Sequence, residues 1–332
     1  MATLEHRLPI GLIGCGGMAK VLARAANRLP RARVVRVCDV SAEAAQAFAQ
    51  ELGVPHTTDP GEVLADPAIL AVIVATPNFT HADLVVRAAA AGKHIFCEKP
   101  LALTTADADR MVAATRAAGV HLVVGQVLRY LPVFHHIKRL IDEGTIGTPF
   151  AMRTSRLGGW GSVPPWRNRR ETSGGPLFEV NAHELDYMRF ILGEPETVYA
   201  TGTRRVVDTV DHEDTAFVTL TFQGGGHAVL HTSIGAALGG YSGVIQGTEG
   251  TLNWTCWPDS LEWKRLDGAG GKLAGKEALP APDAHEREIA HLVDAVLDGT
   301  PPGITGADGR AVVAMAEAAV CSMQTGQPVR LG

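Results

Sequence analysis

Long apolar stretches are missing from this sequence of 332 residues, in which no run approaches the ~20 apolar residues that a membrane-spanning helix needs. An excess of basic residues is missing too. With 30 Lys and Arg against 35 Asp and Glu, the net charge of −5 argues against a general affinity for the polyanionic backbone of nucleic acid. We therefore expect no membrane partner and no nucleic-acid partner. The expected ligand is a small molecule.

Cysteine is scarce as well. The five cysteines form no C-x-x-C pair, which argues against a disulfide framework and against a zinc ribbon, so we expect reduced core thiols. The first seven residues include Glu5 and no apolar signal-type stretch, so the expected location is the cytoplasm. The cysteines are Cys15, Cys38, Cys97, Cys256 and Cys321.

The first third of the sequence alternates short apolar runs with Ala-rich helical patterns. This rhythm is typical of βαβ units, and near-continuous apolar strands indicate a parallel, doubly wound sheet whose two faces are covered by helices. The chain is also long enough for two domains of ~100–200 residues each. The runs are Leu8–Ile13, Arg33–Val37, Ile69–Ala75, His94–Cys97 and His121–Val124.

The pattern changes near Gly125. One amphipathic helix, Val133–Glu143, is followed by strands of period two, which predict a largely antiparallel sheet. We place the domain boundary there, with a first domain over residues 1–125 and a second, α+β domain over residues 126–332. The expected strands are Phe150–Arg156, Thr197–Arg205, Thr215–Phe222, Ala228–Ile234 and Ser242–Gln246, and the expected closing helices are about Ala284–Leu297 and Asp308–Met323.

Two segments of the second domain show no period. Leu157–Pro176 is rich in Gly, Pro and Arg and predicts a long loop of the kind that is often functional. Asp267–Ala278 is expected to be a flexible excursion.

A glycine-rich segment, Gly14-Cys15-Gly16-Gly17-Met18-Ala19, directly follows the first strand and opens a helix. In that context glycines allow a tight turn and close approach to a pyrophosphate, whose charge meets the helix N-terminus. The alternative is a glycine-rich turn that binds nothing. We take Gly14, Gly16, Gly17 and Met18 as candidate dinucleotide contacts.

Asp39 ends the second strand, about 20 residues beyond this loop, where a carboxylate can accept hydrogen bonds from the adenosine ribose hydroxyls. Since it would repel a 2′-phosphate, it favours NAD over NADP. The alternative is an acid at a helix N-terminus, although Ser41 is the better cap for a helix that begins near Ala42. Thr76-Pro77-Asn78 follows another strand at the same sheet edge and is either a ligand loop or a plain turn.

Lys99, Glu179 and His183 are candidates for chemistry. Lys99 lies at the end of a strand, in Glu98-Lys99-Pro100, and a lysine beside a cofactor can polarise a substrate oxygen. Glu179 and His183 are four apart in a helical pattern over Leu177–Leu192, which predicts one shared face. An imidazole can take a hydroxyl proton near neutral pH while a carboxylate orients it.

The spacing of Glu179 and His183 also fits three arrangements without this chemistry. They can be an ordinary i,i+4 helix pair, which is the best interpretation from spacing alone, or His183 can be buried without a catalytic role. They can also be half of a metal site, but a zincin helix would need His at position 187, where this chain has Tyr187, so we expect no metal.

Several motifs in colinear order, from about residue 8 to 329, together resemble the glucose–fructose oxidoreductase / inositol dehydrogenase / rhizopine-catabolism (Gfo/Idh/MocA) family. They are Gly14–Ala19, Ala75-Thr76-Pro77-Asn78 with His81, Ala91-Gly92-Lys93-His94 with Glu98-Lys99-Pro100, Arg129-Tyr130-x-Pro132, Gly174-Gly175-Pro176 with Glu179-x-x-x-His183-x-x-Asp186, and Gly247-Thr248-Glu249-Gly250.

The resemblance implies a first domain of Rossmann type and a second with an open sheet whose outer face forms a homodimer or homotetramer interface. It also places Lys99 and His183 at the reacting hydroxyl and allows a cis bond before Pro100. Glu179 stands where the family most often has Asp, and Asn181 where it often has Gly; these departures concern the substrate rather than the reaction. The implied cofactor contacts beyond the glycine loop and Asp39 are Thr76, Pro77, Asn78, His81, Glu98, Lys99, Trp166 and Arg167.

The function that we predict is NAD-dependent oxidation of a secondary hydroxyl of a sugar, cyclitol or sugar derivative. The alternatives are a family glycosidase that retains NAD and a non-catalytic dinucleotide-binding sensor. The intact Lys99 and His183 argue against the sensor but do not exclude the glycosidase. Five arginines in and around the long loop suggest an anionic substrate, or else a solvated basic loop or an oligomer contact. They are Arg153, Arg156, Arg167, Arg169 and Arg170.

Overall fold

The computed structural model describes residues 7–332 and divides the chain into two compact units. The first comprises the chain up to Val127 together with Asp283–Val313, and the second comprises Leu128–Pro282 and Ala314–Gly332. The sequence pattern predicts a single boundary near residue 125. In the structure, residues 283–313 belong to the first unit as well, although they come late in the sequence. Within residues 7–332, no helix combines the length and the apolar character needed to cross a membrane.

The first unit contains a six-stranded parallel sheet in the order β3-β2-β1-β4-β5-β6. All four residues of β4 are buried, as expected for a strand covered on both faces. The predicted doubly wound parallel sheet is therefore confirmed. The strands are β1 (Leu8–Ile13), β2 (Ala32–Cys38), β3 (His56–Thr57), β4 (Ala71–Val74), β5 (His94–Glu98) and β6 (Leu122–Gly125).

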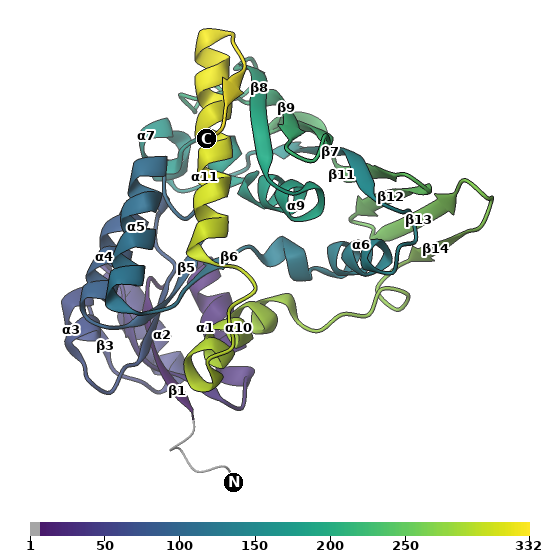
Figure 1. The fold of residues 1–332 in the computed structure, drawn as a ribbon. Helices are drawn as coiled ribbons and strands as arrows, with labels where there is room; N and C mark the ends of the chain where they lie inside the picture. The colour runs from purple at the N-terminus through teal and green to yellow at the C-terminus, as the bar shows by residue number, and fades with distance from the viewer. Residues whose placement is uncertain (1–6) are drawn as a thin grey trace. The chain divides into compact units, whose positions relative to one another are not determined.

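Helix α10 comes from the far end of the sequence but belongs to the first unit, where Figure 1 shows it beside α1. Its Ile289, Leu292 and Val293 lie in the same buried cluster as β1 residues such as Leu12. Arg28 of α1 also forms ion pairs with Asp283 and Glu286. The helices of this unit are α1 (Gly17–Arg28), α2 (Ala42–Leu52), α3 (Pro60–Ala65), η2 (Asn78–Thr80), α4 (His81–Ala90), α5 (Thr105–Ala118) and α10 (Ala284–Asp298).

The second unit contains a nine-stranded sheet in the order β14-β13-β12-β11-β7-β10-β9-β8-β15, in which only the β7–β10 pair of the described pairings is parallel. The open, largely antiparallel sheet is thus confirmed. The strands are β7 (Pro149–Gly159), β8 (Pro195–Thr203), β9 (Thr215–Phe222), β10 (His227–Ser233), β11 (Gly235–Gly247), β12 (Gly250–Cys256), β13 (Ser260–Arg265), β14 (Gly270–Ala274) and β15 (Val329–Arg330).

One face of this sheet is packed against helices through an aromatic cluster. The ring of Phe134, from α6, lies 4.9 Å from the rings of both Tyr187 and Trp254. Tyr187 also donates a hydrogen bond of 2.7 Å to the Phe134 carbonyl. The helices of this unit are η3 (Val127–Tyr130, its first residue in the first unit), α6 (Pro132–Asp142), η4 (Pro165–Asn168), α7 (Arg170–Ser173), α8 (Pro176–Glu179) and α9 (Ala182–Leu192).

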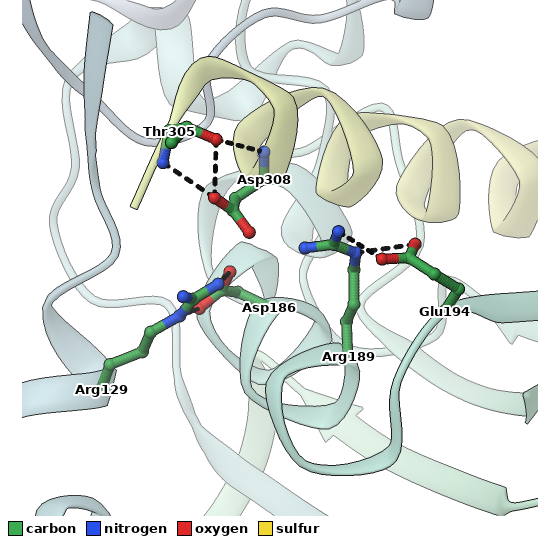
Figure 2. A network of polar contacts seen from close by, with 6 residues as sticks. All are labelled: Arg129, Asp186, Arg189, Glu194, Thr305 and Asp308. Carbon is green, nitrogen blue, oxygen red and sulfur yellow. Dashed lines mark hydrogen bonds and ion pairs between the residues drawn. The ribbon is translucent and has the colours of Figure 1, made fainter. Parts of the chain in front are cut away.

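Helix α11 (Gly306–Thr325) starts in the first unit and ends in the second. Its start is fixed by Thr305 and Asp308: the Asp308 carboxylate accepts 2.8 Å hydrogen bonds from the Thr305 amide and hydroxyl (Figure 2). This is the side-chain capping expected where helix N–H groups lack partners within the helix.

Three sequence expectations for the second unit were wrong. The pattern over Leu177–Leu192 is two helices, α8 and α9, because the helix is interrupted at Val180 and Asn181 and starts again at Ala182. The expected loop Leu157–Pro176 includes the end of β7 and the short helices η4 and α7, and the expected excursion Asp267–Ala278 includes strand β14.

Candidate functional site

The glycine-rich segment links β1 to α1. Gly14 has φ +102°, and a Cβ there would lie 2.4 Å from the Ala75 carbonyl oxygen, so only glycine fits. A Cβ added at Gly16 or Gly17 would meet no described atom within 4 Å. The loop is thus closed toward β4 and open on the other side, where a ligand could approach the backbone.

The N-terminus of α1 is suited to an anion. Its N-cap, Gly16, makes no side-chain capping hydrogen bond, and no acidic residue occupies the first turn. Among the described residues, the leading N–H groups therefore meet no carboxylate that would compete with a phosphate. The residues present fit the diphosphate of a dinucleotide.

Asp39 lies between this loop and the start of α2. Its Oδ2 accepts a 2.7 Å hydrogen bond from the Cys15 amide, and its Oδ1 accepts one of 2.9 Å from the Ser41 amide. The Ser41 hydroxyl caps α2 by accepting the Ala44 N–H, as expected. Asp39 is thereby held against the loop, and each carboxylate oxygen retains a further lone pair for a ligand.

The ends of β4 and β5 are joined through His81, which is fully buried. Its Nδ1 and Nε2 lie 2.9 Å from the carbonyl oxygens of Pro100 and Thr76 respectively. Asn78, in η2, is also buried, and Lys99-Pro100 is a cis peptide bond, as expected. His81 therefore fixes the two loops that carry Thr76, Asn78 and Lys99 at one edge of the sheet.

Glu98, next to Lys99, is buried in an unusual electrostatic environment. Its Oε2 accepts a 3.0 Å hydrogen bond from the Lys99 amide. Burial and repulsion from Glu288 raise the pKa of Glu98 to about 8, while Lys99 and His285 oppose that rise. Glu288 is itself buried and lies 3.2 Å from His285. At neutral pH the Glu98 carboxyl group therefore favours its protonated, neutral form.

In the second unit, Glu179 ends α8 and His183 lies in the first turn of α9. They do not share one helix, so the face argument from their spacing does not apply. Glu179 is buried and forms an ion pair with Arg167, whereas His183 is half-buried. Arg167 also lies over the rings of Trp160 and Trp166, at 5.6 and 5.9 Å. Arg167 of the long loop is therefore joined to α8 through its ion pair with Glu179.

Two buried ion pairs hold helix α9. Arg129 and Asp186 form a bidentate pair of 2.7 and 2.6 Å, drawn in Figure 2 with the pair Arg189–Glu194. Glu184 accepts hydrogen bonds from Arg156, Asn181 and Tyr241 at 2.8, 3.0 and 2.6 Å. Such satisfied networks fix a helix in one orientation, and His183 directly precedes the anchored Glu184 on α9.

The arginines of the long loop are mostly paired with carboxylates of the same unit. Besides Arg156 and Arg167, Arg170 pairs with Glu213, and Arg169 lies 4.0 Å from Asp211. The predicted basic patch is therefore largely neutralised, which weakens the case for an anionic substrate and for a solvated basic loop alike.

The expectation of reduced core thiols is confirmed for three cysteines and wrong for Cys256, which is half-buried, and for Cys321, which is exposed. Cys15, Cys38 and Cys97 are buried, and all five cysteines are free. Burial raises the pKa of Cys15 to about 12 and that of Cys38 to about 11, so Cys15 is not a reactive group of the glycine loop despite its position.

The structure groups the expected residues in two sets. Those at the sheet edge of the first unit are Gly14, Gly16, Gly17, Met18, Asp39, Thr76, Pro77, Asn78, His81, Glu98 and Lys99, and those in the second unit are Trp166, Arg167, Glu179 and His183. Sequence reasoning missed Glu184, Tyr241, Glu288 and Gln126. Glu184 adjoins His183, but a single acidic residue on a helix gives no sign that it is buried.

Comparison with known proteins agrees with this arrangement. Residues 8–126 match the model of an oxidoreductase family with an NAD-binding Rossmann fold, and residues 134–253 match the GFO/IDH/MocA C-terminal domain. The myo-inositol 2-dehydrogenase of Thermotoga maritima is 32% identical over 97% of this chain and 98% of its own. The inositol 2-dehydrogenase of Rhizobium meliloti is 35% identical over 94% of this chain and 96% of its own.

A levoglucosan dehydrogenase solved in complex with NADH is 26% identical, with a TM-score of 0.90 over 98% of this chain and 99% of the other. Fold, glycine loop and both domain matches agree along nearly the whole sequence. This chain therefore belongs to the Gfo/Idh/MocA family of NAD-binding oxidoreductases.

Proposed function

We propose that this protein is an NAD-dependent dehydrogenase that oxidises a secondary hydroxyl of a sugar, cyclitol or sugar derivative. The observation that carries the proposal is the sheet edge of the first unit, where Lys99 follows β5 on the edge that bears the open glycine loop and Asp39. The family membership supports the reaction class, and relatives named as inositol dehydrogenases support the substrate class.

In this proposal Gly14, Gly16, Gly17 and Met18 hold the diphosphate and Asp39 holds the adenosine ribose, so that NAD is bound in preference to NADP. The nicotinamide ring supplies hydride acceptance when NAD is bound. The remaining proposed cofactor contacts at the sheet edge and in the second unit are Thr76, Pro77, Asn78, His81, Glu98, Lys99, Trp166 and Arg167.

His183 is the proposed general base that takes the proton of the reacting hydroxyl, and Lys99 donates a hydrogen bond to the same oxygen. Glu179 orients this pair. Its ion pair with Arg167 supports that role, because it fixes the Glu179 carboxylate in a buried position. Hydride leaves the carbon as the proton leaves the oxygen, so a carbonyl product forms.

One assay separates this function from its rivals. Purified protein is incubated with NAD and a panel of polyols, sugars and nitrophenyl glycosides, while NADH absorbance and nitrophenol are followed together. NADH formation from a polyol or free sugar supports the dehydrogenase. Nitrophenol release without net NADH points to a glycosidase, and NAD binding without either signal across the panel points to a sensor.

We also propose that the outer face of the second unit's sheet joins two copies of the chain, as a dimer or as half of a tetramer, in the cytoplasm. In β8, β9 and β10 buried positions alternate with more exposed ones, and each of these strands exposes one large apolar or aromatic side chain. Tyr199, Phe217 and Val229, on three neighbouring strands, are 40%, 49% and 36% exposed, and apolar side chains exposed together on one face mark an interaction site. Phe217→Arg should halve the mass measured by light scattering, and an unchanged mass would exclude this face.

A further inference from the structure

Gln126 follows strand β6 in the first unit and is 0% exposed. Both polar atoms of its side chain, Oε1 and Nε2, are buried and have no hydrogen-bond partner among residues 7–332. The main-chain N–H of Gln126, by contrast, donates a hydrogen bond of 2.9 Å to the Val124 carbonyl. A side-chain carboxamide that is fully buried and whose oxygen and nitrogen both lack a hydrogen-bond partner is rare in native proteins.

The free-energy cost makes this arrangement informative. A buried polar group without a partner destabilises a fold markedly, whereas Leu or Met has nearly the same volume and carries no such penalty. Packing alone would therefore be served better by an apolar side chain at position 126. The carboxamide has a purpose only if a partner outside the polypeptide uses it.

The position of Gln126 indicates which partner. In the parallel pairing of β5 and β6, the last residue of each strand is paired, Glu98 with Gly125, so Lys99 and Gln126 are the first residues after the two neighbouring strands. Both strands lie at the end of the sheet remote from β2, which leads to Asp39. A dinucleotide with its adenosine ribose at Asp39 and its diphosphate at the β1 loop would extend its nicotinamide end toward β5 and β6.

The neighbouring carboxyl group of Glu98 does not pair with Gln126 in the structure, since neither polar atom of the Gln126 side chain has a partner among the described residues. Glu98 already accepts the Lys99 amide, and its carboxyl group lies against Gly125, where an added Cβ would come within 3.2 Å of it. The Gln126 amide is thus a second, neutral polar group at the same edge, able to donate and to accept at once.

We propose that Gln126 is a ligand-binding residue whose carboxamide hydrogen-bonds a neutral donor-and-acceptor group at the reacting end of the site. This rests on the proposed function, which supplies two such groups: the nicotinamide carboxamide and a hydroxyl of the substrate. Since the nicotinamide carboxamide can pair with Gln126 through two hydrogen bonds, we expect it to be the partner.

The test uses Gln126→Met, which keeps the volume and removes the hydrogen bonds. Thr232→Val is the matched control, because Thr232 of β10 is also buried with an unpartnered hydroxyl but belongs to the sheet of the second unit. Three quantities are measured for each protein: the urea midpoint without ligand, the Kd for NADH alone, and KM and kcat for the substrate found in the panel.

We expect Gln126→Met to unfold at an equal or higher urea concentration than wild type and to bind NADH about tenfold more weakly, as the loss of one to two hydrogen bonds implies. Thr232→Val should match its stability gain and leave the NADH Kd unchanged. If the NADH Kd is unchanged but KM rises about tenfold, the partner is the substrate hydroxyl, which still supports a ligand-binding role.

Two outcomes overturn the inference. If Gln126→Met leaves Kd, KM and kcat at wild-type values, the amide binds no ligand. If it lowers the urea midpoint while the control does not, the amide has a structural role. Failure of the proposed function would look different, because wild type itself would then bind no NADH or turn over no substrate; absent NADH binding also removes the expected nicotinamide partner.

Discussion

The burial of Glu98 beside Glu288 predicts an unusual dependence of stability on pH. The pKa of Glu98 is raised from 4.5 to about 8 in the folded protein, so between these values the folded state binds more protons than the unfolded state. The free energy of unfolding must then fall as pH rises through this window and level off above it. The stabilisation present below pH 4.5 is lost by about pH 8.

The slope follows from linkage. One proton held by the folded state and released on unfolding contributes about 1.4 kcal/mol per pH unit, which over this window amounts to several kcal/mol, on the order of 5. Glu98→Gln replaces the carboxyl by a neutral group of the same shape that can still accept the Lys99 amide. The variant should therefore lack this slope and be more stable than wild type at pH 8.

The assay is urea unfolding of the ligand-free protein at several pH values from 5 to 8, for wild type and Glu98→Gln. The difference between the two curves cancels the histidines that titrate in the same range. Glu288→Gln should flatten the slope as well, since it removes the repulsion that raises the pKa of Glu98. The exposed Glu277→Gln should run parallel to wild type. A difference curve for Glu98→Gln that is flat from pH 5 to 8 would refute this reasoning.

Three further predictions concern ligands and turnover. Lys99→Met and His183→Ala should each lower kcat by ~10²–10⁴, while the affinity for NAD stays within a few-fold of wild type. The double variant should lower kcat by much less than the product of the two single effects. Near-normal turnover of His183→Ala, measured as NADH production, would contradict the assignment of His183 as the general base. Asp39→Ser should narrow the gap between the Kd values for NAD and NADP, and a wild type without such a gap would remove Asp39 as the selector. Arg167→Ala should lower kcat for neutral and anionic substrates alike, because Arg167 is paired with Glu179; a KM increase confined to phosphorylated or uronate substrates would instead show that Arg167 reads the anion.

The parts of this fold that sequence predicts are those with a local physical cause. Gly14 is required by a positive φ and by the nearby Ala75 carbonyl, and such demands leave a motif that can be read residue by residue. Burial on both faces makes β4 continuously apolar, and burial on one face makes β9 alternate, so both sheets could be predicted. The place of Lys99 at the carboxyl edge of the first sheet followed from its position at the end of an apolar strand, since the carboxyl ends of parallel strands meet at one edge.

Other features depend on contacts between distant segments. Helix α10 returns to the first unit because its apolar face completes the core beside α1, and amphipathic helices look alike whichever core they join. The break between Glu179 and His183, and the pairing of Arg167 with Glu179, arise where the long loop meets α8. A sequence shows that a residue is Glu or Gln, whereas only the tertiary structure decides whether water, an arginine or another carboxyl surrounds it. For that reason the properties of Glu98 and Gln126, which depend on desolvation and on neighbours far along the chain, appeared only in the folded protein.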